Sequence, residues 1–252
     1  MVSTVQNTDV KQKDAGQALV VALASHAVFE PAAEDRDGVY RPGVAFPLLQ
    51  ALQTVNRQLL QENPEETLLF DMVLISTDSP QQQSQENIRN STRHHGLEVG
   101  RFCFAGQEDF VGSLLEHGVG LFLSTDRSEV SAASQKGVFS ALLDENAASA
   151  PSEQLRVLLC GDGTVTPSSG QTAPLFLSRL GELRRRFDLL HSPVLIGVLT
   201  ASGGISCCAA ALRALRAYGL EADQAHCLGG APGGPVLAVL RPHLLLSHAL
   251  QD

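Results

Sequence analysis

Short, continuous apolar runs recur along the chain and alternate with stretches whose apolar residues repeat at helical spacing. The runs at 18–24, 70–75 and 119–123 have the length of strands that are buried on both faces. Residues 45–60 carry one apolar face at the spacing of an α-helix. Strands that alternate with helices form a parallel sheet covered by helices, so the pattern predicts an α/β fold. The other elements expected in this part are a strand at 98–104 and helices at 85–95, 110–117 and 128–136.

The same alternation begins again after residues 144–153, which are rich in Ala, Ser, Asn and acidic residues and indicate a linker. Residues 1–16 are polar and lack periodicity, so we expect them to be disordered. The predicted organisation is a tail at 1–16, a first half at 17–143, a linker at 144–153 and a second half at 154–252. Within the second half, strands are expected at 155–159, 194–199, 221–228 and 244–246, and helices at 173–187, 207–218 and 235–240.

The two halves match each other in more than their order of elements. His95-Gly96-Leu97-Glu98 in the first half corresponds to Tyr218-Gly219-Leu220-Glu221 in the second. Cys103-Phe104-Ala105-Gly106 corresponds in the same way to Cys227-Leu228-Gly229-Gly230, and a short helix and an apolar strand follow each. This correspondence predicts an internal duplication of two Rossmann-like halves. One continuous sheet and two packed sheets are both compatible with the spacing.

Composition and charge narrow the class of partner. The formal net charge of -9 and the pI near 5.3 argue against a general nucleic-acid or membrane-surface binder, which needs a basic face. The one basic cluster, Arg184-Arg185-Arg186, lies on an expected helix and is favoured as a solvated face over a phosphate site. No signal-peptide pattern is present, and no apolar run reaches the ~18 residues of a membrane span.

The five cysteines lack the spacing of a disulfide framework, which favours a reduced, cytoplasmic location. The adjacent pair Cys207-Cys208 suggests a metal or redox site at first sight. However, neighbouring side chains on a helix point about 100° apart, and no second Cys pair completes a zinc site. We therefore expect both to be structural thiols.

The stretch with the strongest chemical signal is the strand at 155–159 and the loop that follows it. That loop reads Cys160-Gly161-Asp162-Gly163-Thr164, with one carboxylate between two glycines. In open α/β sheets, ligands bind just beyond the carboxyl ends of the strands. The loop is therefore the expected location of a functional site.

A buried strand followed by this Gly-Asp-Gly loop resembles the first motif of the cytosolic 5'-nucleotidase I family, a branch of the haloacid dehalogenase superfamily. The resemblance extends from about residue 18 to the C-terminus. It implies a haloacid dehalogenase-like fold and, for active members, Mg²⁺-dependent hydrolysis of nucleoside monophosphates such as AMP and IMP. Further segments that match the family, in the family's order, lie at 42–47, 101–106, 121–126, 198–201 and 227–230.

The resemblance also implies a set of site residues. In the family, one Asp attacks phosphorus, a second Asp two residues later acts as acid and base, and a hydroxyl and a Lys hold the phosphoryl group. Here Cys160 stands at the nucleophile position, and Asp162 matches the acid/base position, although a turn residue explains it equally well. Thr200 matches the phosphate-holding hydroxyl, and Gly233 stands at the Lys position.

Other family features are also replaced. Ser247 and His248 stand at the distal acid positions, so catalytic Asp162 and Thr200 would be remnants. The insertions that cover the nucleotide in the family are reduced to 30–41 and 166–172, so the cap is largely lost. In the first half, Glu108 and Asp109 place negative charge where a phosphate would be repelled.

These replacements favour a degenerate family member. A thiolate is a poor Mg²⁺ ligand, so we expect no metal and no cofactor, with Mg²⁺ bound only if catalysis persists. Backbone N–H groups in Gly-rich loops can cradle an anion, although turns explain such glycines equally well. The phosphate-binding candidates are Gly161, Gly163, Gly229 and Gly230.

Three functions fit this inventory. The first is a pseudoenzyme that binds an unidentified protein partner or a second copy of itself, with no nucleic-acid or membrane partner. The second is a working Mg²⁺-dependent 5'-nucleotidase, and the third is a non-catalytic nucleotide sensor. The first is favoured, because removal of one member of a catalytic unit already costs orders of magnitude in rate and several members are replaced here.

Overall fold

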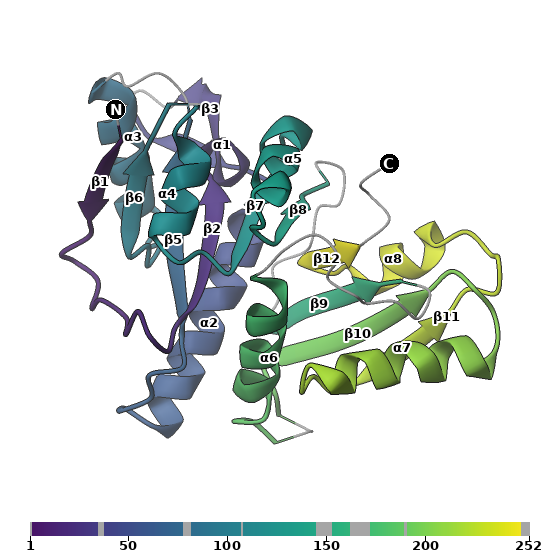
Figure 1. Ribbon diagram of the computed structural model, residues 1–252. Coiled ribbons are helices and arrows are strands. Elements are labelled where there is room, and N and C mark those ends of the chain that lie inside the picture. The colour runs from purple at the N-terminus through teal and green to yellow at the C-terminus, as the bar shows by residue number, and fades with distance from the viewer. Residues whose placement is uncertain are drawn as a thin grey trace.

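The computed structural model describes residues 2–34, 38–77, 82–106, 108–144, 153–161, 172–188 and 191–247. Within these residues the chain forms two sheets of mainly parallel strands, each covered by helices, and a small antiparallel hairpin (Figure 1). The predicted α/β fold is confirmed. Of the two arrangements that the spacing allows, the structure shows two separate sheets.

The first sheet has the order β1-β6-β5-β2-β7-β8, and the second has the order β11-β10-β9-β12. The strands of the first sheet are β1 (Ser3–Gln6), β2 (Leu19–Ala24), β5 (Phe70–Ser76), β6 (Arg101–Phe104), β7 (Leu121–Ser124) and β8 (Ser140–Leu142). Those of the second are β9 (Leu155–Cys160), β10 (Val194–Thr200), β11 (Gln224–Cys227) and β12 (Leu244–Ser247). The hairpin consists of β3 (Phe29–Glu34) and β4 (Tyr40–Pro42).

Helices connect these strands as the periodicity predicts. Their bounds are α1 (Ser25–Val28), α2 (Phe46–Glu62), α3 (Gln82–His94), α4 (Phe110–Glu116), α5 (Arg127–Gln135), α6 (Ala173–Arg184), α7 (Ile205–Ala217) and α8 (Gly234–Leu240). The sequence did not predict α1, the hairpin or β8, because each of these elements is short.

Four strands have the same arrangement in both sheets. Numbered in chain order within each set of four, the order is third, second, first, fourth, as β6-β5-β2-β7 and as β11-β10-β9-β12, and all neighbours in these sets are parallel. Parallel pairing places the carboxyl ends of the strands at one edge of each sheet. Ligands of open α/β sheets bind at this edge.

The expectation that residues 1–16 are disordered is wrong for β1. Ser3–Gln6 pairs antiparallel with β6, with Val5 opposite Phe102, and Val5 packs against the core. An edge strand needs backbone pairing on one side only, so a polar segment with one inward side chain can form it. Such a segment is too short and too polar to show strand periodicity.

A single core joins the two sheets. Every residue of β2 is buried, as expected for a central strand with helices on both faces. Between the sheets, α2 contacts both β5 and β9, and α6 contacts β2 (Figure 1). The guanidinium of Arg179 on α6 donates to the Ala18 carbonyl at 2.9 Å, which ties the start of β2 to the second half.

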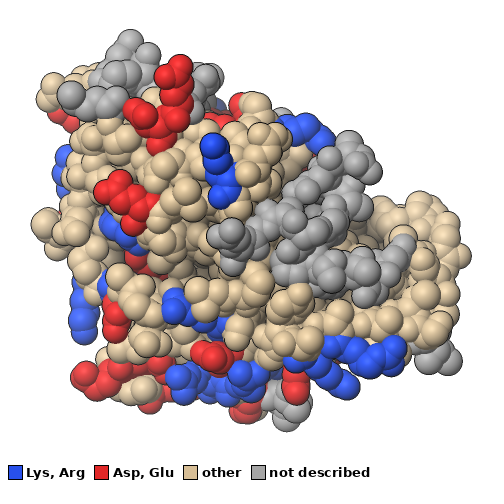
Figure 2. Space-filling view, in the orientation of Figure 1, with Lys and Arg blue, Asp and Glu red and all other residues tan. Residues whose placement is uncertain are grey.

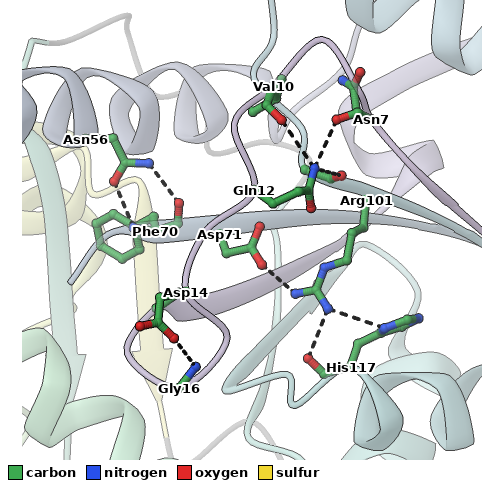
Figure 3. A network of polar contacts seen from close by, with 12 residues as sticks. Asn7, Val10, Gln12, Asp14, Gly16, Asn56, Phe70, Asp71, Arg101 and His117 are labelled. Carbon is green, nitrogen blue, oxygen red and sulfur yellow. Dashed lines mark hydrogen bonds and ion pairs between the residues drawn. The ribbon is translucent and has the colours of Figure 1, made fainter. Parts of the chain in front are cut away.

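Buried polar side chains fix the position of β5 in the first half (Figure 3). The Asn56 amide on α2 donates to the Phe70 carbonyl at 2.8 Å and accepts from the Phe70 N–H at 2.8 Å. On the other side, Arg101 of β6 pairs with Asp71 of β5 at 2.5 Å and also contacts His117. These interactions satisfy polar groups that would be costly to bury alone.

The basic cluster differs from the expected solvated face at its first residue. Arg184 is 6% exposed, and its guanidinium binds the Asp223 carboxylate with Nη2–Oδ1 at 2.6 Å. Asp223 Oδ2 also accepts from the Ile196 N–H at 2.8 Å, so this ion pair joins α6 to β10. Arg185, in contrast, is exposed and donates to the Gly219 carbonyl.

Replacement of Arg184 by Met should destabilise the protein by about 2 kcal/mol, because the Asp223 carboxylate, whose side chain is 21% exposed, loses its counter-charge. The matched control is Arg185→Met on the next residue, which should cost less than about 1 kcal/mol because its side chain is exposed. Urea unfolding monitored by circular dichroism measures both. Equal stability of the two variants would contradict the structural role assigned to Arg184.

A buried histidine predicts a pH dependence of stability. His243 is 6% exposed, and burial, followed by the nearby Arg156 charge, lowers its pKa to about 4 from 6.5. Between pH 4 and pH 6.5, the His243 imidazole is therefore protonated in the unfolded chain and neutral in the folded chain. The associated stability, up to about 3 kcal/mol, is complete above pH 6.5 and is lost as the pH falls toward 4.

The variant His243→Asn isolates this contribution. An Asn carbonyl retains an acceptor for the Arg156 N–H, which now donates to His243 Nδ1 at 3.2 Å, but it does not titrate. Urea unfolding at pH 7 and at pH 4.5 should show a smaller loss of stability in the variant than in the parent chain. The assignment fails if both proteins lose the same stability over this interval.

Candidate functional site

The carboxyl ends of the four strands of the second sheet bring together the positions that the sequence singles out. Cys160 at the end of β9 is the register partner of Leu199 on one side and of Ser247 on the other. Thr200 at the end of β10 is the partner of Cys227 at the end of β11. The positions matched to the nucleophile, the hydroxyl and one distal acid therefore lie along one edge. Asp162, Gly163 and His248 lie outside the described residues, as does the side chain of Ser247.

The Cys160 thiol is held in its neutral form. Burial raises its pKa to about 11. Near neutral pH the group is therefore a thiol, whereas both nucleophilic attack and metal binding require the thiolate. A neutral thiol at this position supplies neither the negative charge nor the hard oxygen ligands that Mg²⁺ prefers.

The Thr200 side chain is engaged within its own loop. It is fully buried, and its hydroxyl donates to the Ser202 carbonyl at 3.2 Å. The same hydroxyl contacts the Cys227 thiol. Its backbone carbonyl accepts from the Leu228 N–H at 2.8 Å, so the residue connects the ends of β10 and β11.

Glycines at this edge allow the loops that follow β9, β10 and β11 to pack closely together. The N–H of Gly161 donates to the Leu199 carbonyl at 3.1 Å, and that of Gly230 donates to the Ala201 carbonyl at 3.0 Å. Two of the donors proposed for a phosphate are therefore already used. A Cβ at Gly203 would lie 2.6 Å from the Gly229 Cα, so glycine is required where these two loops touch. Gly229 also has a φ of +62°, which favours glycine.

Gly233 occupies the N-cap of α8, at the position where the resemblance implies a lysine. Its φ is −72°, and a Cβ there would meet only the Leu228 side chain at 3.3 Å and the Leu199 side chain at 3.9 Å. The backbone therefore does not demand glycine.

The residues described at this edge do not fit a magnesium site. Across the parts of the chain that the structure describes, no three His, Cys, Asp or Glu side chains lie close enough to hold a metal ion. Mg²⁺ needs several oxygen ligands in octahedral geometry, and the described side chains here are thiols and one engaged hydroxyl. No catalytic step through a metal follows from this arrangement.

A second polar cluster, which the sequence did not reveal, lies at the carboxyl edge of the first sheet. Glu129 on α5 is 8% exposed and accepts from the Thr77 hydroxyl at 2.6 Å and from the Ser124 hydroxyl at 2.6 Å. His26 Nε2 lies 3.2 Å from Ser124 Oγ and 3.8 Å from the Glu129 carboxylate. The carboxylate is therefore surrounded by donors, and it would repel a phosphate at this edge.

The sequence contained one signal for this cluster. Asp126 caps α5 by accepting from the Ser128 N–H at 2.7 Å, and Glu129 follows three residues later. This spacing is that of a capping box, in which the glutamate usually turns back to the N-cap. Here Glu129 instead points to the ends of β5 and β7, which only the fold brings near.

On the face drawn in Figure 2, Lys and Arg residues are interspersed with Asp and Glu residues, and the described residues show no large basic patch there. None of the helices in the described ranges combines the length and the apolar character needed to cross a bilayer. Neither observation points to a partner.

These features define the class of protein: an α/β protein with parallel sheets whose candidate site lies at the carboxyl ends of the strands. A family model described as 5'-nucleotidase matches residues 31–171. Human cytosolic 5'-nucleotidase 1B is 33% identical to this chain over an alignment that covers 82% of the chain and 39% of the human protein. No solved structure matches.

The chain belongs to the cytosolic 5'-nucleotidase family. The predicted resemblance is confirmed at this level. The chain spans about two fifths of the length of this relative. The family match includes the strand and loop around Cys160.

The state of the Cys160 thiol predicts slow alkylation. With a pKa of about 11, its thiolate fraction at pH 7.5 is about a hundredfold below that of an unperturbed thiol of pKa 9. Iodoacetamide should therefore modify Cys160 far more slowly in the folded protein than in urea. Peptide mass spectrometry on samples quenched at intervals gives both rates. Similar rates in the two states would show that the thiol is ionised or freely accessible.

Proposed function

We propose that this chain is a non-catalytic member of the cytosolic 5'-nucleotidase family that acts by binding a protein partner or a second copy of itself. The observation that carries the proposal is the half-buried, neutral Cys160 thiol at the position matched to the nucleophile. Gly233 at the matched lysine position supplies no amine. A phosphoryl group would meet neither a carboxylate nucleophile nor a cation at these positions.

The fold supports an origin by duplication. Both halves place their four parallel strands in the same order. The matched glycines Gly96 and Gly219 both have positive φ, of 63° and 72°, just after α3 and α7. We therefore propose a duplicated, haloacid dehalogenase-like pair of Rossmann-like halves at 17–143 and 154–252. The linker at 144–153 that we propose between them lies mostly outside the described residues.

Two surface features favour a role in association. The strand β11 ends its sheet, and an end strand presents backbone groups to which a partner strand can pair. On α8, the helix that follows β11 in the chain, Val239 is 78% exposed. The name of the human relative supports a cytosolic location, which we also propose for this chain.

The assay that tests this function is phosphate release from AMP and IMP in the presence of Mg²⁺. The chain should release no more phosphate than its Asp162→Ala variant, with human cytosolic 5'-nucleotidase 1B as the positive control. Release above that variant would overturn the proposal in favour of a working nucleotidase.

Calorimetric titration with the same nucleotides distinguishes the proposed function from that of a non-catalytic nucleotide sensor. The proposal expects no binding below millimolar concentration, whereas a nucleotide sensor would bind without turnover. Sedimentation velocity over a dilution series then distinguishes self-association from the need for a different partner. A strictly monomeric chain would direct the search to partners captured from native cells.

A further inference from the structure

We propose that Cys208 and Cys227 form a redox-active dithiol that a peroxide converts to an intramolecular disulfide. The two cysteines are 19 positions apart in sequence, on α7 and at the end of β11. From the sequence alone, Cys207 and Cys208 are expected to be structural thiols, because no second Cys pair accompanies them. In the structure, however, the Cys208 side chain contacts Cys227.

The geometry brings the two thiols into contact. The helix α7 packs against β10 and β11, and the Cys208 and Cys227 side chains lie within hydrogen-bonding contact of each other. The end of β11 is held in place, because Leu228 N–H donates to the Thr200 carbonyl at 2.8 Å. All five cysteines are reduced in this structure, so the pair is an open dithiol.

The two thiols differ in a way that suits a peroxide-sensing pair. Cys227 is exposed, and hydrogen bonds from Thr200 first and Cys208 second lower the pKa of its thiol. The pKa of Cys208 is raised, mainly because it donates its proton to Cys227. An exposed thiol whose ionisation is favoured, in contact with a second thiol that donates to it, is the arrangement of an attacking and a resolving cysteine.

The chemistry balances with a peroxide as the oxidant. The Cys227 thiolate attacks one peroxide oxygen, the O–O bond breaks, and Cys227 sulfenic acid and one hydroxide form. The Cys208 sulfur then attacks the sulfenic sulfur, and the S–O bond breaks with loss of water as the thiol proton leaves. With hydrogen peroxide as the oxidant, the hydroxide takes up the proton that Cys227 released on ionisation, so two thiols become one disulfide and the peroxide becomes two molecules of water.

The other cysteines lack this combination of features. Burial raises the pKa of both Cys103 and Cys160. Cys207 neighbours Cys208 on the same helix, so its side chain points about 100° away from that of Cys208. Oxidation should therefore be selective for one pair. The disulfide would tie α7 to β11 beside Thr200, within the edge that carries the candidate site.

The test uses the full chain, reduced and then exposed to hydrogen peroxide, alkylated and digested without reductant. We expect one cross-linked peptide that joins residues 208 and 227, with a mass lower by two hydrogen atoms, and its loss on addition of dithiothreitol. The matched control Cys207→Ser should give the same cross-link. With Cys208→Ser, oxidation should stop at a sulfenic acid on Cys227 that dimedone traps.

Three outcomes would overturn the proposal. One is a cross-link that includes Cys207, Cys103 or Cys160 in place of the proposed pair. Another is a disulfide only between two chains, which sedimentation would reveal. The third is Cys227 that remains unmodified while peroxide oxidises methionines in the same sample. Circular dichroism of each variant, compared with the parent, excludes unfolding as the cause of altered reactivity.

Discussion

Parallel pairing of β9, β10, β11 and β12 is the constraint on which the candidate site depends. Because the carboxyl ends of parallel strands meet at one edge, the residues at those ends become neighbours although they are far apart in sequence. Cys160, Thr200, Cys227 and Ser247 lie along this edge through strand register alone. Whatever chemistry these side chains carry is therefore combined at one place.

Burial then constrains which side chains this edge can hold together. A carboxylate at residue 160 would be partly removed from water, and it would need a metal ion or an amine to remain charged. A lysine at residue 233 would in turn need a phosphate or a carboxylate nearby. Without such a partner either group would be an uncompensated charge, whereas a neutral thiol and a glycine need no counter-charge. At the first sheet, the buried Glu129 carboxylate is stabilised by the Thr77 and Ser124 hydroxyls that donate to it.

The sequence was sufficient for features that depend on local pattern. The strands and helices predicted in both halves are present within a few residues of their bounds, because apolar runs and helical periodicity report burial directly. It failed where a side chain's partner is distant. Arg184 meets Asp223, and Glu129 meets Thr77, only after the sheets have formed. Likewise, β1 is fixed by pairing with β6, which no pattern within Ser3–Gln6 can show.

The cysteines at matched positions show how one topology gives two chemistries. Cys103 lies in β6 and Cys227 in β11, each the third in chain order of the four parallel strands that the two sheets share. In the first sheet β1 pairs with the outer edge of β6, and Cys103 is fully buried, which raises its pKa. In the second sheet β11 is the end strand, and Cys227 is exposed beside Thr200, whose hydrogen bond lowers its pKa. A single added strand therefore separates an inert thiol from a reactive one.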